Sequence, residues 1–368
     1  MMGVKMQRNV RRSILLAVCI IVFIFFEIHS CSRDRVTEPS VPPVESIICS
    51  ATNVFFLDGS FGCVTGAVGT IMITRDGGVT WTGSKIEEGT LTGAQFIDAE
   101  TGWVVGKDGA IFKTTDGGMN WTKIVSSGYP YDEDFYKINF RNGALGYLLG
   151  YHGVYCTVDG GSDWCNNWLA LVPYRGAWDM SIVNDTVGYL LGSKYSDPDP
   201  IIIYRTVDGG MTWSPVSGSS GSLLRTITTI SFVSRDVGWA GGGVIMKTDD
   251  GGMVWENQVA SATVRRMSFV DEMCGFAVGG AAILRTTDGG TTWENVTPVD
   301  SRISDLRGVC FISRDLGWVV GRASDQSVNG TLYKRSILLR TRDGGATWKL
   351  SEFPFDYTGY DDVVGPVD

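Results

Sequence analysis

The sequence predicts an all-β fold, a single seven-bladed β-propeller, on three observations. The eight-residue phrase T-x-D-G-G-x-x-W occurs seven times in the 368 residues. Successive copies lie 38 to 55 residues apart, 44.5 on average, which is a period typical of propeller blades. Between copies, short β-branched and aromatic runs alternate with Gly-rich turns, which favours strands over helices. These observations predict seven units of four antiparallel strands each.

Residues 1–30 have the pattern of an export signal. Four basic residues precede an apolar run over residues 14–26, which is short for a membrane-spanning helix. The segment Ile28-His29-Ser30-Cys31 resembles the bacterial lipobox, although His29 departs from the small or aliphatic residue usual there. We therefore expect export to the bacterial cell envelope with a lipid anchor on Cys31. The alternatives are an ordinary cleaved signal peptide and an uncleaved anchor.

Residues 31–45 predict an extended, Pro-containing tether between the membrane and the propeller. Residues 46–368 then form the propeller, and the blades take up residues 46–353. Two ways of closing the ring stay open. Residues 47–52 could add a strand to the last blade, or the tail at 354–368 could cover the first.

The pattern within one blade is clearest before the second copy of the phrase. Phe96-Ile97-Asp98 is followed by Gly102-Trp103-Val104-Val105-Gly106 and then by Gly109-Ala110-Ile111-Phe112-Lys113-Thr114. We expect one strand before the Gly-Trp pair, one through it, one entering the phrase and one leaving through its Trp. The same order recurs in later blades, which predicts a common blade structure.

The phrase itself predicts a turn that holds a hairpin together. Its Asp can accept backbone N–H bonds across the turn, and its two Gly supply positive φ angles. Its Trp begins the next strand and can cover the turn with the indole ring. We expect structural roles for the seven Asp and the seven Trp, which are Asp76, Asp116, Asp159, Asp208, Asp250, Asp288 and Asp343, and Trp81, Trp121, Trp164, Trp213, Trp255, Trp293 and Trp348.

Charge and cysteine content indicate which ligands and which covalent links to expect. The formal net charge is −9 and residues 1–30 carry +3, so the part from Cys31 onward carries −12. An acidic domain argues against general nucleic-acid binding. Cys156 and Cys165 bracket the third phrase at symmetric places on a hairpin, so they predict either a disulfide or two buried thiols. We expect no metal and no cofactor.

Catalytic residues are scarce. The chain has two His, and His29 lies in the predicted signal, so His152 would have to serve any Ser-His-Asp triad. His152 falls in a Gly-flanked turn, where an exposed residue is expected. Glycosidase chemistry needs only two carboxylates, but seven of the Asp are expected to be committed to turns. The unrepeated acidic groups, residues 132–134 and 197–199, are interpreted as solvated loop charge.

The phrase resembles the Asp-box, or BNR repeat, of sialidases, some xyloglucanases and several non-enzymatic propellers. The longer unit F-x-D, G-W-x-V-G, G-x-I, T-x-D-G-G-x-x-W is most similar to the photosystem II stability/assembly factor family, over about residues 46–353. That resemblance implies a seven-bladed propeller that acts as an assembly factor and uses an arginine-rich surface. The Arg-Ile-Pro segment of sialidases is missing near the first strands, and the nearest match, Arg302-Ile303-Ser304, lacks the Pro.

Differences between the repeats indicate where function could lie. When the blades are aligned on the last residue of the innermost strand, the position four earlier is Thr52, Thr92, Tyr136, Trp178, Thr228, Arg265 and Arg307. Together with Arg175, Arg225 and Arg266, the aromatic and arginine members predict a binding face near the central channel. The alternative is ordinary surface Arg paired with nearby Asp. Insertions at 193–200 and 322–336 lengthen turns in blades four and seven and either carry recognition or are variable padding.

The sequence thus predicts an exported, monomeric propeller that catalyses nothing and recognises another macromolecule. A protein partner is favoured, and the membrane is contacted through the lipid anchor only. The alternative is a glycan-binding or glycoside-hydrolysing Asp-box propeller. The two hypotheses differ in outcome, since the first predicts a co-purifying protein and the second predicts binding or turnover of a glycan.

Overall fold

The computed structural model describes residues 50–86, 89–125, 133–164, 174–194, 201–217, 226–259, 263–324, 326–328, 331–333 and 335–353. Contacts divide the chain into two units, Met1–Val44 and Glu45–Asp368. The predicted signal and Cys31 lie outside the described residues. Within the described ranges, no helix is both long enough and apolar enough to cross a membrane.

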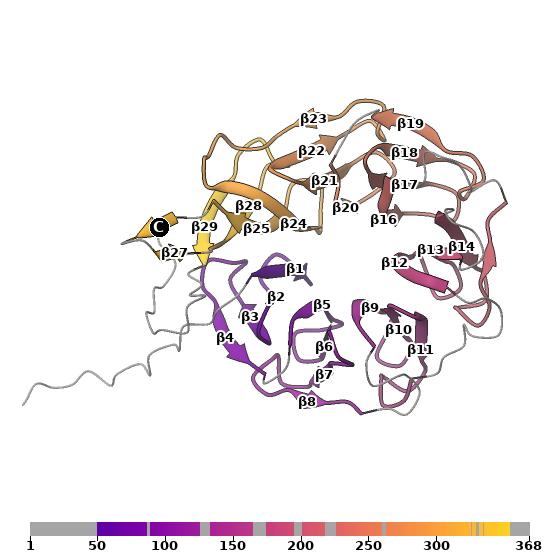
Figure 1. Ribbon diagram of the computed structural model, residues 1–368, viewed down its shortest axis with the longest axis horizontal. Coiled ribbons are helices and arrows are strands. Elements are labelled where there is room, and N and C mark those ends of the chain that lie inside the picture. Colours follow the sequence, from indigo (N-terminus) through magenta and orange to yellow (C-terminus); the bar gives the residue numbers. More distant parts are fainter. Residues whose placement is uncertain are drawn as a thin grey trace, which may run out of the picture. The chain divides into compact units, whose positions relative to one another are not determined.

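The first four blades follow one another along the chain (Figure 1). Blade 1 contains β1 (Ala51–Phe56), β2 (Gly62–Gly66), β3 (Thr70–Thr74) and β4 (Thr82–Lys85). Blade 2 contains β5 (Leu91–Phe96), β6 (Gly102–Gly106), β7 (Ile111–Thr114) and β8 (Thr122–Lys123). Blade 3 has three described strands, β9 (Phe135–Phe140), β10 (Gly146–Gly150) and β11 (Gly153–Thr157). Blade 4 contains β12 (Tyr174–Ile182), β13 (Gly188–Lys194), β14 (Ile201–Thr206) and β15 (Ser214–Pro215).

The last three blades repeat the order and complete the ring. Blade 5 contains β16 (Ile227–Phe232), β17 (Gly238–Gly242), β18 (Ile245–Thr248) and β19 (Glu256–Val259). Blade 6 contains β20 (Arg266–Phe269), β21 (Gly275–Gly279), β22 (Ala282–Thr286) and β23 (Glu294–Asn295). Blade 7 contains β24 (Ile303–Phe311), β25 (Gly317–Ala323), β28 (Ser336–Thr341) and β29 (Lys349–Phe353), and its insertion forms a separate hairpin of β26 (Gln326–Val328) and β27 (Thr331–Tyr333).

The prediction of a seven-bladed, all-β propeller is confirmed. Each blade pairs its strands antiparallel in chain order, with the first strand innermost in the ring (Figure 1). Ala51 and Thr52 belong to the innermost strand of blade 1, so they do not extend the last blade. Blades 1 and 7 therefore meet without exchanging a strand between the described residues. The other closing segment that the sequence suggested, 354–368, lies outside them.

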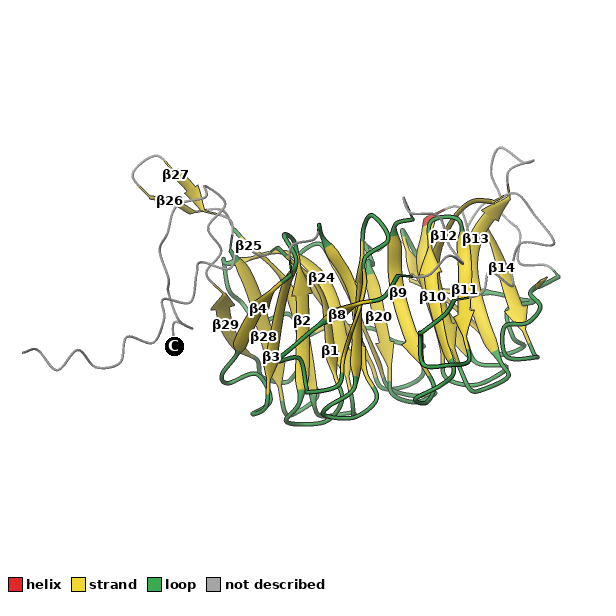
Figure 2. Cartoon of the chain, turned by 90° about the horizontal axis from the view of Figure 1, so that it is seen from below, coloured by secondary structure: helices red, strands yellow, loops and turns green. Residues whose placement is uncertain are grey.

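The alternating strand directions give the propeller two distinct ends, seen at the top and bottom of the sheets in Figure 2. One end carries the Asp-box turns and the turns between first and second strands, and we call it the box face. The other end carries the turns between second and third strands and the links from blade to blade, and we call it the channel face. Both blade insertions join second to third strands, so both belong to the channel face.

Aromatic side chains of the second strands pack the blades against each other. Trp318 stacks on Phe56 of the next blade with ring centroids 3.5 Å apart, and Trp239 stacks on Phe269 at 3.6 Å. The Gly before each such residue has a steric reason, since a Cβ at Gly317 would collide with the Phe311 ring. The Gly-Trp pairs in the sequence are therefore packing sites between blades.

Each Asp-box turn is closed by its own side chains. In blade 1, Thr74 Oγ1 donates to Asp76 Oδ1 at 2.8 Å and accepts from Gly78 N at 2.8 Å. Asp76 Oδ1 also accepts from the amides of Val79 and Thr80, at 2.9 and 2.8 Å. Both Gly of every box have positive φ, from 68° to 93°. The Thr, the Asp and the Gly pair thus satisfy the turn internally.

The boxes also join neighbouring blades. The carbonyl of Gly77, the first box Gly of blade 1, accepts from Trp318 Nε1 at 2.9 Å and from Arg340 Nη1 at 3.0 Å, both in blade 7. Other boxes accept equivalent bonds, from Arg75 to Gly117 and from Arg285 to Gly344. A box is therefore a clasp that the preceding blade binds, and this contact closes the ring between blades 7 and 1.

Candidate binding face

The variable position of the innermost strands has two kinds of occupant. Where it is Thr, the hydroxyl ties two blades together: Thr52 donates to the Leu91 carbonyl, Thr92 to the Phe135 carbonyl, and Thr228 to the Val264 carbonyl at 3.1 Å. An Arg, Tyr or Trp at this position lacks the short hydroxyl that makes this bond. Blades with Arg, Tyr or Trp at this position therefore cannot make this bond from a threonine hydroxyl to the next blade.

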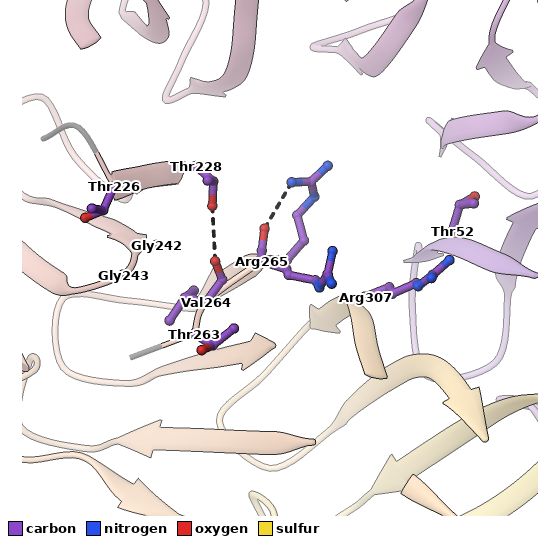
Figure 3. A pocket seen from close by; sticks show the side chains of 10 residues that line it. Thr52, Thr226, Thr228, Gly242, Gly243, Thr263, Val264, Arg265 and Arg307 are labelled. Atoms are coloured by element: carbon purple, nitrogen blue, oxygen red, sulfur yellow. Dashed lines mark hydrogen bonds between the residues drawn. The ribbon is translucent and has the colours of Figure 1, made fainter. Parts of the chain in front are cut away.

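Three of the predicted arginines line one cavity on the channel side of the innermost strands. Arg265 and Arg266 from blade 6 and Arg307 from blade 7 line a space of about 670 Å³, which also meets Thr52 of blade 1 and Thr228 of blade 5. Figure 3 labels Arg265, Arg307, Thr52 and Thr228, which come from separate blades to line this space. The strand alignment thus identified residues that the fold brings together, and we call this space the arginine cavity.

One carboxylate serves two of these arginines. Asp305 accepts from Arg307 Nε at 3.0 Å and lies 3.2 Å from Arg265 Nε. Arg307 Nη1 also donates to Ser50 Oγ at 3.0 Å, and Arg266 Nη1 donates to the Arg265 carbonyl at 3.0 Å. The alternative, in which each Arg is paired with a nearby Asp, therefore applies to Arg265 and Arg307, which share Asp305. Three guanidinium groups thus line the cavity, and Asp305 bridges two of them, which favours binding of an anionic group.

A second charged pair lies on neighbouring inner strands and is structural. Asp179, which is 1% exposed, accepts from Lys137 Nζ at 2.8 Å and from Thr229 Oγ1 at 2.7 Å. Burial raises the pKa of Asp179, but the charges of Lys137 and Arg266 and the hydrogen bonds outweigh it, so the pKa lies below its ordinary value. Asp179 thus stays charged and joins blades 3, 4 and 5, and Lys137 is committed to it.

The predicted aromatic members do not line the arginine cavity. Tyr136 is half-buried and packs against the core of blades 3 and 4, whereas Trp178 is 40% exposed. Arg175 lies in β12 but its side chain is outside the described residues, and so is all of Arg225. The described part of the predicted face is therefore divided between arginines on blades 6 and 7 and aromatics on blades 3 and 4.

The base of the blade 7 insertion is held by an ion-pair network that the sequence analysis did not find. Arg302 donates to both carboxylate oxygens of Asp300, at 2.9 and 2.6 Å, and to Glu352 at 2.9 Å. Arg335 pairs with the same Glu352. The hydrogen bonds from Arg302 lower the pKa of Asp300 to about 2. Arg302, the residue nearest to a sialidase-type arginine in the sequence, is thus engaged in holding an insertion.

The interpretation of residues 132–134 as solvated charge is wrong for Glu133, which is 0% exposed. Its carboxylate accepts from the His152 amide at 2.8 Å and from Tyr155 Oη at 3.1 Å, and it lies 2.6 Å from His152 Nδ1. Gly150 makes the space, because a Cβ there would collide with Glu133 Oε1. His152 is half-exposed at its turn, as expected, but one ring nitrogen is already occupied by this contact.

The box carboxylates are poor candidates for general acids. The bond from the Asn120 amide, followed by those from the Asn120 and Thr114 side chains, lowers the pKa of Asp116 to about 2, and bonds from Thr347 do the same for Asp343. A glycosidase acid needs a raised pKa. Among the described residues, no group of three or more His, Cys, Asp or Glu is placed to hold a metal. Cys165 lies outside the described residues, so its disulfide with Cys156 stays a prediction.

Comparisons with known proteins agree with this architecture. A family model described as photosynthesis system II assembly factor YCF48 matches residues 42–132, which include blades 1 and 2. No curated protein matches the chain.

Three of the solved structures with this fold illustrate the likeness. YCF48 bound to D1 peptide is 21% identical, covers 80% of this chain and 95% of its own, and has a TM-score of 0.63. YCF48 from Cyanidioschyzon merolae is 21% identical, covers 76% and 94%, and has a TM-score of 0.60. The WD40 β-propeller domain of Doa1 is 13% identical, covers 75% and 90%, and has a TM-score of 0.58. The chain is thus similar to YCF48 in fold and, over its first two blades, in sequence.

Proposed function

We propose that this chain is a non-catalytic propeller that binds another protein at the arginine cavity. The observation that carries the proposal is the convergence of Arg265, Arg266 and Arg307 from two blades on one space with a single bridging carboxylate, Asp305. Guanidinium groups recognise carboxylates with directional hydrogen bonds, so an acidic segment or a carboxylate of the partner fits this site.

Two further observations support a protein partner. The family match to the YCF48 assembly factor lies in this chain, and a solved YCF48 with the same fold has a D1 peptide bound. The seven box carboxylates are engaged by hydrogen bonds of their own turns, and each has a pKa below its ordinary value. They therefore hold the scaffold, and the arginines carry the binding.

Crosslinking in intact cells followed by mass spectrometry tests the proposal. We expect one protein to be captured reproducibly, and we expect Arg265→Ala with Arg307→Ala to lower its yield by at least about tenfold, because desolvated charge pairs dominate such contacts. Arg314→Ala is the matched control, since Arg314 of blade 7 pairs on the box face with Asp271 of blade 6. Unchanged capture by the double variant would contradict the proposal, and a hit on a glycan array without a protein partner would favour the glycan-active alternative.

We also propose that the protein is exported and anchored to the cell envelope through a lipid on Cys31. The support is the basic and apolar pattern of residues 1–30 and the lipobox-like segment that ends at Cys31. Growth with a labelled fatty-acid analogue should label the protein, and Cys31→Ala should abolish the label. A wild-type protein without label would exclude the lipid anchor but leave a cleaved signal peptide in place.

A further inference from the structure

The variable positions of the box turns carry exposed apolar side chains on one part of the box face. In T-x-D-G-G-x-x-W, the x before the Asp and the two after the second Gly differ between blades. In blades 4 and 5 these positions include four side chains that are 49 to 66% exposed, Val207, Met211, Met253 and Val254. The boxes of blades 6 and 7 have Thr, Arg or Ala there. A gathering of exposed apolar side chains is typical of a protein-binding surface.

A groove lies between the boxes of blades 4 and 5. Val207 of the blade 4 box and Met253 of the blade 5 box line a space of about 260 Å³. Pro215 and Val216, which follow the blade 4 box, add further apolar surface. The rest of the wall consists of Arg205, Thr212, Ser214 and Ser217. An apolar side chain of a partner that enters this groove therefore contacts two blades at once.

The turns around the groove make the box face strongly acidic. The seven boxes and the seven turns between first and second strands together hold seventeen Asp or Glu residues and five Arg. Each box Asp is bound by its own turn and has a pKa below its ordinary value, so these charges persist at neutral pH. Asp185 in blade 4 and Asp249 in blade 5 pair with Arg141 and Lys247, but their side chains are 70 and 63% exposed. The box face therefore attracts a cationic partner.

The edge of blade 4 and the chemistry of the groove indicate the form of this partner. The outermost strand of blade 4, β15, has only Ser214 and Pro215, and Pro215 has no N–H, so the edge offers little backbone for pairing with a further strand. Met side chains are unbranched and flexible, so they adapt to the apolar face of a bound helix. An acidic surface lined with Met and Val thus suits a basic amphipathic helix with apolar residues at i, i+3, i+4 and i+7.

We propose that the groove between the boxes of blades 4 and 5 is a second docking site, and that its occupant is a basic amphipathic helix of a partner protein. The apolar side of the helix packs on Val207, Met211, Met253 and Val254, and its basic side chains meet the acidic turns around them. The inference goes beyond the proposed function, since the arginine cavity lies on the channel face and selects the opposite charge.

The probe is a fluorescein-labelled peptide of about 18 Leu and Lys residues, with Leu at i, i+3, i+4 and i+7. Fluorescence anisotropy gives its Kd for the full chain, at one detergent concentration throughout so that peptide lost to micelles affects every measurement equally. A scrambled peptide of the same composition has no apolar face, and we expect it to bind at least about tenfold more weakly. The Kd of the amphipathic peptide should rise between about 0.1 and 1 M KCl, because the Debye length falls from about 10 to about 3 Å.

Exposed methionines locate the binding without disturbing the fold. Met211→Ser with Met253→Ser should weaken peptide binding at least about tenfold, because it removes apolar contacts from both sides of the groove. Met119→Ser is the matched control, since Met119 occupies the same box position in blade 2 and is 71% exposed, and it should change the Kd by less than about twofold. Equal Kd values for the amphipathic and scrambled peptides, equal effects of the two methionine variants, or no peptide binding would overturn the inference.

The two sites can be judged separately. Arg265→Ala with Arg307→Ala should leave the Kd of the Leu and Lys peptide within about twofold of its value for the unaltered chain, because these residues line the cavity on the channel face. A loss of peptide binding in this variant would contradict a separate site on the box face. Failure of the crosslinking experiment at the arginine cavity would refute the proposed function and leave the peptide measurements unaffected.

Discussion

Arginine side chains have different roles on the box face and in the arginine cavity. On the box face, Arg75 and Arg340 donate to box carbonyls of neighbouring blades, at 3.0 Å each, and this arrangement recurs around the ring. In the cavity, Arg265 and Arg307 replace a Thr that elsewhere ties two blades, and they share one Asp. The comparison teaches that the repeated positions of the boxes maintain the ring, whereas Arg265 and Arg307, at a position that differs between blades, line an open cavity.

The contrast can be tested first with two tryptophans. Trp318 is 0% exposed, stacks on Phe56 and donates to the Gly77 carbonyl, whereas Trp178 on the innermost strand of blade 4 is 40% exposed. We expect Trp318→Ala to lower the free energy of unfolding by about 3–5 kcal/mol, because it opens a cavity where the ring closes. Trp178→Ala should cost less than about 1 kcal/mol. Urea denaturation measures both, and similar losses would break the comparison.

The box threonine should have a smaller effect. Thr341 is 1% exposed, donates to Asp343 Oδ1 and accepts from Gly345 N, both at 2.8 Å. Thr341→Val keeps the shape but leaves the Gly345 amide without its hydroxyl, so we expect a loss of about 1–3 kcal/mol in unfolding free energy. The control is Thr287→Val at an exposed position of the blade 6 box, for which less than about 0.5 kcal/mol is expected. A control that destabilises equally would refute the clasp account.

Acid should weaken the clasps gradually. Bonds from Thr347 hold the pKa of Asp343 at about 2 in the folded protein, below the value of about 3.9 for an unfolded chain. Because the folded pKa is depressed, this stabilisation is complete above about pH 4 and is lost as the pH falls toward 2. Asp343→Asn should therefore show a shallower decline of unfolding free energy between pH 4 and 2 than the unaltered chain. Parallel pH profiles would show that Asp343 makes no such contribution.

Much of the fold could be predicted from the sequence because each box forms its turn with bonds among its own residues. Its Thr, Asp and two Gly make the turn from local bonds, so seven copies mark seven blades without knowledge of distant contacts. The contact between a box and the preceding blade could not be predicted from the sequence. It joins residues such as Arg340 and Gly77, which are 263 positions apart, and no local pattern indicates that pair.

The candidate site could be predicted in part for a related reason. Aligning blades placed Arg265 and Arg307 at equivalent positions, and the ring then brought them to one cavity. Asp305 was missed, although it lies two residues before Arg307, a spacing that puts both on one side of a strand. Glu133 was misassigned because its burial depends on the space left by Gly150 and on bonds from the turn at His152. Such burial is set by packing rather than by local charge.

The most direct test compares two pairs of arginine substitutions in the same chain. Arg75→Ala with Arg340→Ala removes clasp bonds, and Arg265→Ala with Arg307→Ala removes the cavity charges. Crosslinked partner yield and urea stability are measured for both. We predict that the clasp pair loses stability and keeps its capture within about twofold, while the cavity pair keeps its stability and loses capture at least about tenfold. Equal loss of capture by both pairs, or full capture by the cavity pair, would contradict the division between structural repeats and a binding cavity.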